Sequence, residues 1–267
     1  MLLAIDIGNT NIVVGVFRDE RLLHSWRLST QPQRTADEMG MWALQLFHHG
    51  QLDPGDIDAV VLASVVPTLT RPTVEMARRY FKHDALVVHG STDTGMPLLV
   101  DEPGQVGADR IVNGVAAFGR FGRSADGTPQ ELIVIDFGTA TTFDAISDRG
   151  EYRGGVISPG VNISADALFQ RAARLPRVEV RRPGVVIGRT TVAQMQSGLF
   201  WGYVGMVEGI VARMRKEMGP KVCSVATGGL ADMIAPDTPS IDIVDRDLTL
   251  HGLRLIWNRN AAKGAAR

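Results

Sequence analysis

The sequence has few of the features that mark secreted, membrane-bound or nucleic-acid-binding proteins. Its one cysteine, Cys223, cannot form an internal disulfide and so implies no oxidising compartment. The longest uncharged run, 190–207, contains polar residues and glycines, and it falls short of the ~20 apolar residues that a membrane span needs. The formal net charge is −1, without the positive excess that phosphate backbones attract. We expect a cytoplasmic protein with no nucleic-acid or membrane partner.

Several common catalytic motifs are also missing. No lysine follows a glycine, which excludes the P-loop, and no G-x-G occurs, which excludes the dinucleotide-binding fingerprint. The six histidines lack the spacing of zinc ligands. The chemistry must therefore come from other residues.

The first half of the chain alternates predicted strands and helices. Two strands within 2–17 are joined by a turn at Gly8-Asn9-Thr10, and a third strand follows at 22–28. Thr35 and Glu38 form the capping-box pattern at the start of a helix over 35–50. After it we expect the following elements in order: a strand at 57–65, a helix at 72–81, a strand at 85–88 and a helix at 108–121. This order predicts an α/β protein with parallel pairing.

The opening pattern returns after a Gly/Ser/Asp-rich linker at 122–127. Three strands are expected at 132–136, 140–147 and 152–157, then helices at 164–174 and 192–218, a strand at 222–226, a helix starting near Leu230 and a last helix after Leu248. We therefore expect two similar halves, 1–121 and 128–267.

Two acidic turns occupy equivalent places in the halves. Asp6 begins D-I-G-N-T-N, and Asp136 begins D-F-G-T-A-T. Glycine and small hydroxyl residues let backbone N–H groups approach phosphate oxygens, while the carboxylate can hold a metal ion or its water shell. One such turn is more simply an ordinary hairpin, because these residue types favour turns. Two in equivalent positions favour phosphate binding.

Two further segments lie at expected helix starts. Ala226-Thr227-Gly228-Gly229 leaves room for a flat ring such as adenine, although a plain strand-to-helix turn would look the same. Gly107-Ala108-Asp109-Arg110 reads alone as a helix cap with an ion pair. Beside two phosphate turns, Asp109 becomes a candidate base and Arg110 a candidate anion clamp.

The motifs, taken in order, resemble those of type III pantothenate kinases. They are D-I-G-N-T-N at 6–11, V-G-A-D-R at 106–110, D-F-G-T-A-T-T at 136–142, Y-x-G-G-V-I-S-P-G at 152–160, A-x-L-P at 173–176, T-x-x-x-M-Q-S-G at 191–198 and A-T-G-G at 226–229. The resemblance covers nearly the whole chain. It implies duplicated ribonuclease-H-like domains of the actin-like ATPase fold, with ATP in the cleft between the halves. It also implies a homodimer that uses ATP, Mg²⁺ and a monovalent cation, K⁺ or NH₄⁺, to convert pantothenate to 4'-phosphopantothenate, the first step toward coenzyme A.

The resemblance also implies a role for individual residues. The expected ATP-binding residues are Asp6, Ile7, Gly8, Asn9, Thr10, Asn11, Ile12, Val13, Thr139, Gly228 and Gly229. The expected substrate-binding residues are Gly107, Ala108, Asp109, Arg110, Thr191 and Val100. Asp109 would be the proton acceptor, Asp136 the ligand of the monovalent cation and Asp6 a residue near Mg²⁺. Val100 is a departure, since many members carry tyrosine there.

Two alternatives remain open from the residues alone. A kinase of the same superfamily acting on a sugar or another small acid is one, and V-G-A-D-R argues against it. A regulatory protein that binds without turnover is the other, and the carboxylates at Asp6, Asp109 and Asp136 argue against that.

The helix expected over 191–211 bears on assembly. Its apolar residues cover more than one face, so either the helix is central to its own domain or a partner covers part of it. Gly198, Gly202 and Gly205 would let a second helix approach. We expect a dimer through this half.

Overall fold

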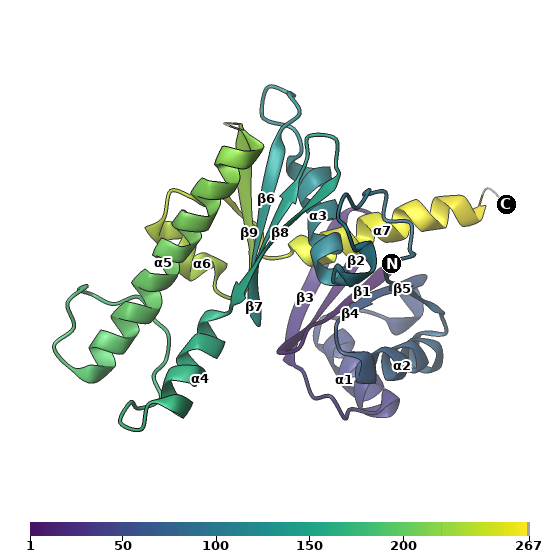
Figure 1. Ribbon diagram of the computed structural model, residues 1–267. Coiled ribbons are helices and arrows are strands. Elements are labelled where there is room, and N and C mark those ends of the chain that lie inside the picture. The colour runs from purple at the N-terminus through teal and green to yellow at the C-terminus, as the bar shows by residue number, and fades with distance from the viewer. Residues whose placement is uncertain (220, 266–267) are drawn as a thin grey trace. The chain divides into compact units, whose positions relative to one another are not determined.

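Each half of the chain folds into a five-stranded sheet of the same topology (Figure 1). The first sheet has the order β3-β2-β1-β4-β5, made of β1 (Leu2–Ile7), β2 (Asn11–Arg18), β3 (Arg21–Ser29), β4 (Ala59–Ser64) and β5 (Ala85–Val88). The second has the order β10-β9-β6-β7-β8, made of β6 (Glu131–Phe137), β7 (Ala140–Ile146), β8 (Tyr152–Pro159), β9 (Val222–Gly228) and β10 (Ile243–Val244). In both, three antiparallel strands are followed by two parallel ones. The repeated topology confirms the duplicated α/β fold expected from the sequence.

The computed structural model describes residues 1–219 and 221–265, which group into two compact units. Unit 1 comprises 1–97, 101–119 and the segment from Asp247 onward, and unit 2 comprises 98–100 and 120–246. Among the described residues, no helix is both long and apolar enough to cross a membrane.

Alternating strand residues build a core on each face of the first sheet. Leu3, Ile5 and Ile7 of β1 pack with helix α1 (Ala36–His49) and helix α2 (Pro67–Met76). Ala4 of β1 instead packs with residues of α3 (Ala108–Phe121) and α7 (Leu248–Ala265). Because side chains alternate across a strand, the two cores lie on opposite faces.

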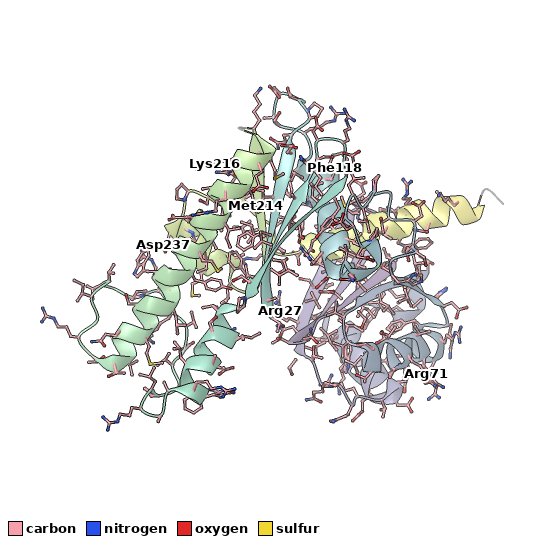
Figure 2. All side chains as sticks on the ribbon, in the orientation of Figure 1. Arg27, Arg71, Phe118, Met214, Lys216 and Asp237 are labelled. Carbon is pink, nitrogen blue, oxygen red and sulfur yellow. The ribbon has the colours of Figure 1, made fainter. Side chains whose placement is uncertain are left out.

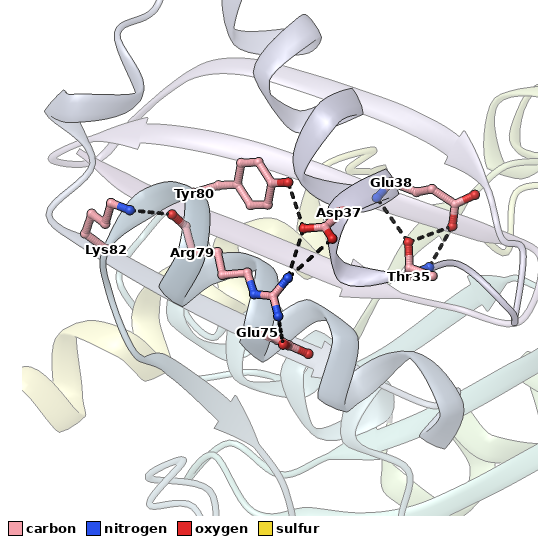
Figure 3. A network of polar contacts seen from close by, with 7 residues as sticks. All are labelled: Thr35, Asp37, Glu38, Glu75, Arg79, Tyr80 and Lys82. Carbon is pink, nitrogen blue, oxygen red and sulfur yellow. Dashed lines mark hydrogen bonds and ion pairs between the residues drawn. The ribbon is translucent and has the colours of Figure 1, made fainter.

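Polar contacts join α1 to the π-helix Ala77–Phe81 that follows α2 (Figure 3). Thr35 and Glu38 form the capping box at the start of α1, as the sequence predicts. Arg79 Nη1 donates to Asp37 Oδ1 at 3.1 Å, and the Tyr80 hydroxyl donates to the same oxygen at 2.9 Å. These hydrogen bonds, from Tyr80 first and then Arg79, lower the pKa of Asp37.

One face of the second sheet is covered by helices. Ile133, Ile135 and Phe137 of β6 pack with apolar residues of α4 (Val161–Arg171), α5 (Thr191–Met218) and α6 (Ala231–Ile234). Met214 on α5 belongs to this core, while Lys216, two residues further on, is exposed; Figure 2 labels both. The other β6 residues, Leu132, Val134 and Asp136, alternate with this core set and so lie on the opposite face.

The helices predicted at 72–81 and near Leu230 differ from the observed ones. The helix expected at 72–81 begins at Pro67, because proline suits a first helical turn, and it contains Pro72. Its last residues, Ala77–Phe81, form a π-helix. The helix expected near Leu230 is only four residues long and continues as a 3₁₀ turn, Ala235–Asp237. Strand β10 and two other 3₁₀ turns, Pro54–Asp56 and Pro103–Gln105, have no counterpart in the prediction.

The C-terminal helix also differs from the predicted division into 1–121 and 128–267. Helix α7 packs on β1, β2, β4 and β5, so it belongs with the first sheet although it follows the second in sequence. Gly252 allows α7 to approach α3 closely, because a Cβ there would collide with Val112 O and would stand 2.7 Å from Val112 Cγ1. Residues 220, 266 and 267 lie outside the described part of the chain.

Candidate active site

The first acidic turn joins β1 to β2. Asp6 pairs with Val13 across the hairpin and with Ala63 of the parallel strand β4. Gly8 N–H donates to Asn11 O at 3.0 Å, and the Thr30 hydroxyl donates to Gly8 O at 2.6 Å. Asn9 and Thr10 are exposed at the tip, whereas Ile7 and Ile12 are buried and anchor the turn. The hairpin thus presents polar groups on a fixed backbone next to a half-buried carboxylate.

The second acidic turn joins β6 to β7 in the equivalent place. Asp136 pairs with Thr142 of β7 and with Thr227 of β9. Gly138 N–H donates to Ala140 O at 3.1 Å. The two hairpins are therefore alike in register and in the position of the aspartate, although this loop is one residue shorter, with Phe137 paired to Thr141 where Ile7 pairs to Ile12.

Gly228 lies against the Asp136 carboxylate. Its φ is +91°, and a Cβ there would stand 2.6 Å from Asp136 Oδ1 and 2.7 Å from Phe137 N. Only glycine combines this left-handed backbone with so close an approach. The structure thus brings together Asp136, Thr139 and the A-T-G-G segment in unit 2; Gly229 follows directly in the turn that leads to α6.

A buried tyrosine fixes the backbone around this turn. The Tyr203 hydroxyl of α5 donates to Pro159 O at 2.8 Å and is hydrogen-bonded to the Thr141 hydroxyl. Burial is the main cause of the raised pKa of Tyr203, so the phenol stays protonated and can donate. Gly160, which follows Pro159, packs on the Thr139 carbonyl too closely for any side chain.

The Gly107–Arg110 segment forms the start of α3 in unit 1. Asp109 is half-buried in the first helical turn, and its Oδ1 accepts a hydrogen bond from Arg110 N at 2.8 Å. A Cβ at Gly107 would lie 2.6 Å from that same oxygen, so the glycine makes room for the carboxylate. This hydrogen bond to the N–H of the next residue orients the Asp109 carboxylate within the first turn of α3.

The two remaining substrate candidates lie in unit 2. Thr191 is exposed at the first residue of α5, directly after the N-cap Thr190, whose hydroxyl accepts from Ala193 N at 3.2 Å. Val100 is half-buried, and its Cγ1 lies 3.7 Å from the position of a Cβ on Gly154 of β8.

The donor set for metal ions is sparse. Among the described residues, no group of three or more His, Cys, Asp or Glu side chains could form a protein cage for a metal ion. Mg²⁺ in nucleotide sites is usually bound by one or two carboxylates together with waters and phosphate oxygens, so the single carboxylate of Asp6 fits it. For a monovalent cation the candidate donor is the Asp136 carboxylate, which the Gly228 backbone approaches too closely for any side chain to intervene.

The model of the type III pantothenate kinase family matches residues 2–213. The chain belongs to that family. A type III pantothenate kinase of Moorella thermoacetica is 54% identical over 260 residues, covering 97% of this chain and 100% of the relative. That of Myxococcus xanthus is 54% identical over 262 residues and covers 98% and 100%.

Solved structures add the fold. A 2-dehydro-3-deoxygalactonokinase from Sinorhizobium meliloti has a TM-score of 0.57 at 12% identity and covers 98% of this chain and 96% of its own. An inorganic polyphosphate/ATP-glucomannokinase from Arthrobacter has a TM-score of 0.53 at 18% identity and covers 97% and 98%. These identities are too low to transfer a substrate, and the likeness shows the actin-like ATPase fold of sugar kinases.

Several residues around the turns were not singled out from the sequence. Thr30, which ties the first turn to β3, and Tyr203, which ties the second turn to α5, carry no local signal that separates them from other strand and helix residues. Asp144 of β7 follows the acidic turn by a few residues and is buried. A charged residue within an apolar alternating strand was the one available signal for it.

We expect Gly228→Ala to destabilise the protein and displace the Asp136 carboxylate. Alanine is strained at positive φ, and such a Gly→Ala change lowers the free energy of unfolding by more than ~1 kcal/mol. Urea unfolding should therefore show a loss of stability above that value. Gly184→Ala is the matched control, since Gly184 is exposed with nothing within 4 Å of its Cβ position. Equal midpoints for the two variants would contradict the close approach.

Proposed function

We propose that this protein transfers the γ-phosphoryl group of ATP to the primary hydroxyl of pantothenate, with Asp109 as the general base. Membership of the family gives the reaction: ATP-dependent phosphorylation of pantothenate to 4'-phosphopantothenate, in coenzyme A biosynthesis. The observation that supports the role of Asp109 is its fixed carboxylate at the start of α3, held by Arg110 N and accommodated by Gly107.

The two acidic turns, at Asp6 and at Asp136, would bind the nucleotide. The backbone of 6–13 binds the ATP phosphates, Thr139 contacts ATP, and Gly228 and Gly229 accept the adenine ring. Mg²⁺ bound near Asp6 would neutralise part of the negative charge of the ATP phosphates. Backbone N–H groups and small side chains suit this task because phosphoryl transfer depends mainly on positioning and on stabilising charge spread over the γ-phosphoryl oxygens.

The acceptor is positioned by the substrate segment. Asp109 takes the proton from the pantothenate hydroxyl as its oxygen attacks the γ-phosphorus in line with the leaving ADP oxygen. Arg110 binds the substrate carboxylate as a planar donor. Thr191 and Val100 complete the binding surface, and valine in place of the tyrosine of many relatives removes one hydroxyl from it. We place the enzyme in the cytoplasm.

Asp109→Asn should keep the fold and ATP binding but lose most turnover. The change removes a proton acceptor at nearly constant volume, and general-base catalysis is typically worth ~10²- to 10⁴-fold in kcat. ADP release with pantothenate measures turnover, and calorimetry measures ATP binding. Asp148→Asn, at an exposed position of the β7–β8 turn, is the control and should behave like the wild type. Turnover of Asp109→Asn at the wild-type level would refute the assignment.

We infer that Asp136 holds the monovalent cation. Activity should then be low in Na⁺ or Tris alone and restored by K⁺ or NH₄⁺. The bound cation would balance the negative charge of the Asp136 carboxylate next to the anionic nucleotide. In Asp136→Asn the stimulation by K⁺ should disappear. Undiminished turnover of the wild type after exhaustive removal of K⁺ and NH₄⁺ would show that this assignment is wrong.

We further propose a homodimer through α5. The apolar residues of α5 are mostly covered by the second sheet of the same chain, so their burial supplies no argument for a partner. The argument for a partner comes from the opposite side of α5. Gly198, Gly202 and Gly205 each have nothing within 4 Å of their Cβ positions. An open depression is lined by Gly198, Trp201 and the exposed Ile187. Small residues beside exposed apolar groups suit a two-fold helix contact.

Light scattering at micromolar concentration should give about twice 28.9 kDa. Gly202→Leu should lower both the mass and the activity, because a bulky side chain separates the paired helices. Asn258→Leu, which adds the same side chain to an exposed position of α7, should change neither. A fully active monomer, or a Gly202→Leu dimer with normal activity, would remove this proposal.

A further inference from the structure

A buried carboxylate in the second sheet has no part in the roles assigned above. Asp144 of β7 is 1% exposed, as is Tyr152 at the start of β8. Asp144 Oδ1 accepts from the Tyr152 hydroxyl at 2.8 Å, and Oδ2 accepts from the Thr142 hydroxyl at 3.2 Å. Burying a carboxylate is costly unless hydrogen bonds compensate, and an apolar residue would fill the same place more cheaply. The position therefore calls for a reason other than stability.

The Thr142 hydroxyl lies beside the second acidic turn, which contains Asp136. Thr142 is the residue directly opposite Asp136 in the antiparallel pairing of β6 and β7. Side chains of directly opposed residues lie on the same face of a sheet, with Cβ atoms ~5 Å apart. Thr142 and Asp144, two residues apart on β7, also share that face. Asp144 thus orients a hydroxyl that stands beside the Asp136 carboxylate.

The other hydroxyl belongs to Tyr152, whose backbone contacts the segment that carries Val100. Residues 98–100 are the only part of the first 119 residues that group with unit 2. They are held there through Tyr152, since Leu99 N–H donates to Tyr152 O at 2.8 Å and Leu98 forms a parallel bridge with the same residue. Asp144 fixes the ring of Tyr152, and the backbone of Tyr152 fixes the segment that ends at Val100.

We propose that Asp144 is a positioning residue that couples the second acidic turn, which contains Asp136, to the segment 98–100, which carries Val100. It acts on the cation through the Thr142 hydroxyl and on pantothenate through Tyr152, without touching either ligand. The inference rests on the proposed roles of Asp136 and of Val100. Its consequence is that cation binding and pantothenate binding share one buried group.

Single substitutions separate the effect on cation binding, through Thr142, from the effect on pantothenate binding, through Tyr152. Thr142→Val removes the hydroxyl near Asp136 at similar volume and should reduce the stabilisation by K⁺, while the Kd for pantothenate stays within about twofold. Tyr152→Phe should do the reverse and weaken pantothenate binding roughly three- to tenfold, part of what one hydrogen bond to a charged group contributes. Asp144→Asn should show both effects, and Thr142→Ser should restore the response to K⁺.

Binding measurements test this independently of turnover. The rise in Tm with added KCl, compared with equal NaCl, reports cation binding, because a ligand that binds only the folded state stabilises it. Calorimetry with pantothenate in the presence of a non-hydrolysable ATP analogue reports substrate binding. Ser147→Ala is the control for general damage, since Ser147 bonds Glu151 at the far end of the β7–β8 hairpin.

The outcomes distinguish the coupling from the function on which it rests. If Thr142→Val and Tyr152→Phe lower Tm but keep the wild-type response to K⁺ and the wild-type Kd, as Ser147→Ala should, Asp144 is only structural and the proposal fails. These two variants decide the matter even if Asp144→Asn does not fold. A wild-type protein that binds no pantothenate, or that gains equally from KCl and NaCl, refutes the proposed function itself and the coupling with it.

Discussion

The hairpin that follows the first strand of each sheet is the constraint on which the site depends. In both sheets an aspartate near the end of the central strand is paired on one side to the hairpin and on the other to a parallel strand. This double pairing leaves the backbone of the turn no freedom to change register, because a slip of one residue would move each buried strand residue to the other face. Asp6 and Asp136 are therefore fixed by the same cores that stabilise the two units.

Glycines then determine what each turn can approach. Gly228 allows β9 to pass beside the Asp136 carboxylate, Gly160 allows β8 to close on Thr139, and Gly107 leaves space for the Asp109 carboxylate. In each case an alanine would collide with the backbone or the carboxylate of the site. The sequence predicted close approaches of a ligand at the glycines of the family motifs, but it could not show that groups of the chain itself, such as the Asp136 and Asp109 carboxylates, approach them.

The sequence predicted those helices and strands well whose structure is determined by their own residues. The Thr35–Glu38 capping box, the strand at 85–88 and the helix at 108–121 were confirmed because caps, alternation and glycines act over a few residues. The place of α7 depends on contacts far apart in sequence and was not foreseeable from periodicity. The same holds for Tyr203, whose hydroxyl bonds Thr141 and Pro159 at separations of 62 and 44 residues. The partners of Asp144, Thr142 and Tyr152, are close in sequence, but periodicity does not show that their side chains meet on one face of the sheet. Among the site residues, Asp6, Asp109 and Asp136 stood out from their motifs, and their roles remain proposals.

The most direct test of the account is ADP release by the purified protein with pantothenate and, separately, with a panel of sugars, in the presence of Mg²⁺ and K⁺. The account predicts rapid, saturable release with pantothenate alone and formation of 4'-phosphopantothenate in equal amount. Release with a sugar at a comparable rate, or none above the background ATP hydrolysis with pantothenate, would contradict it.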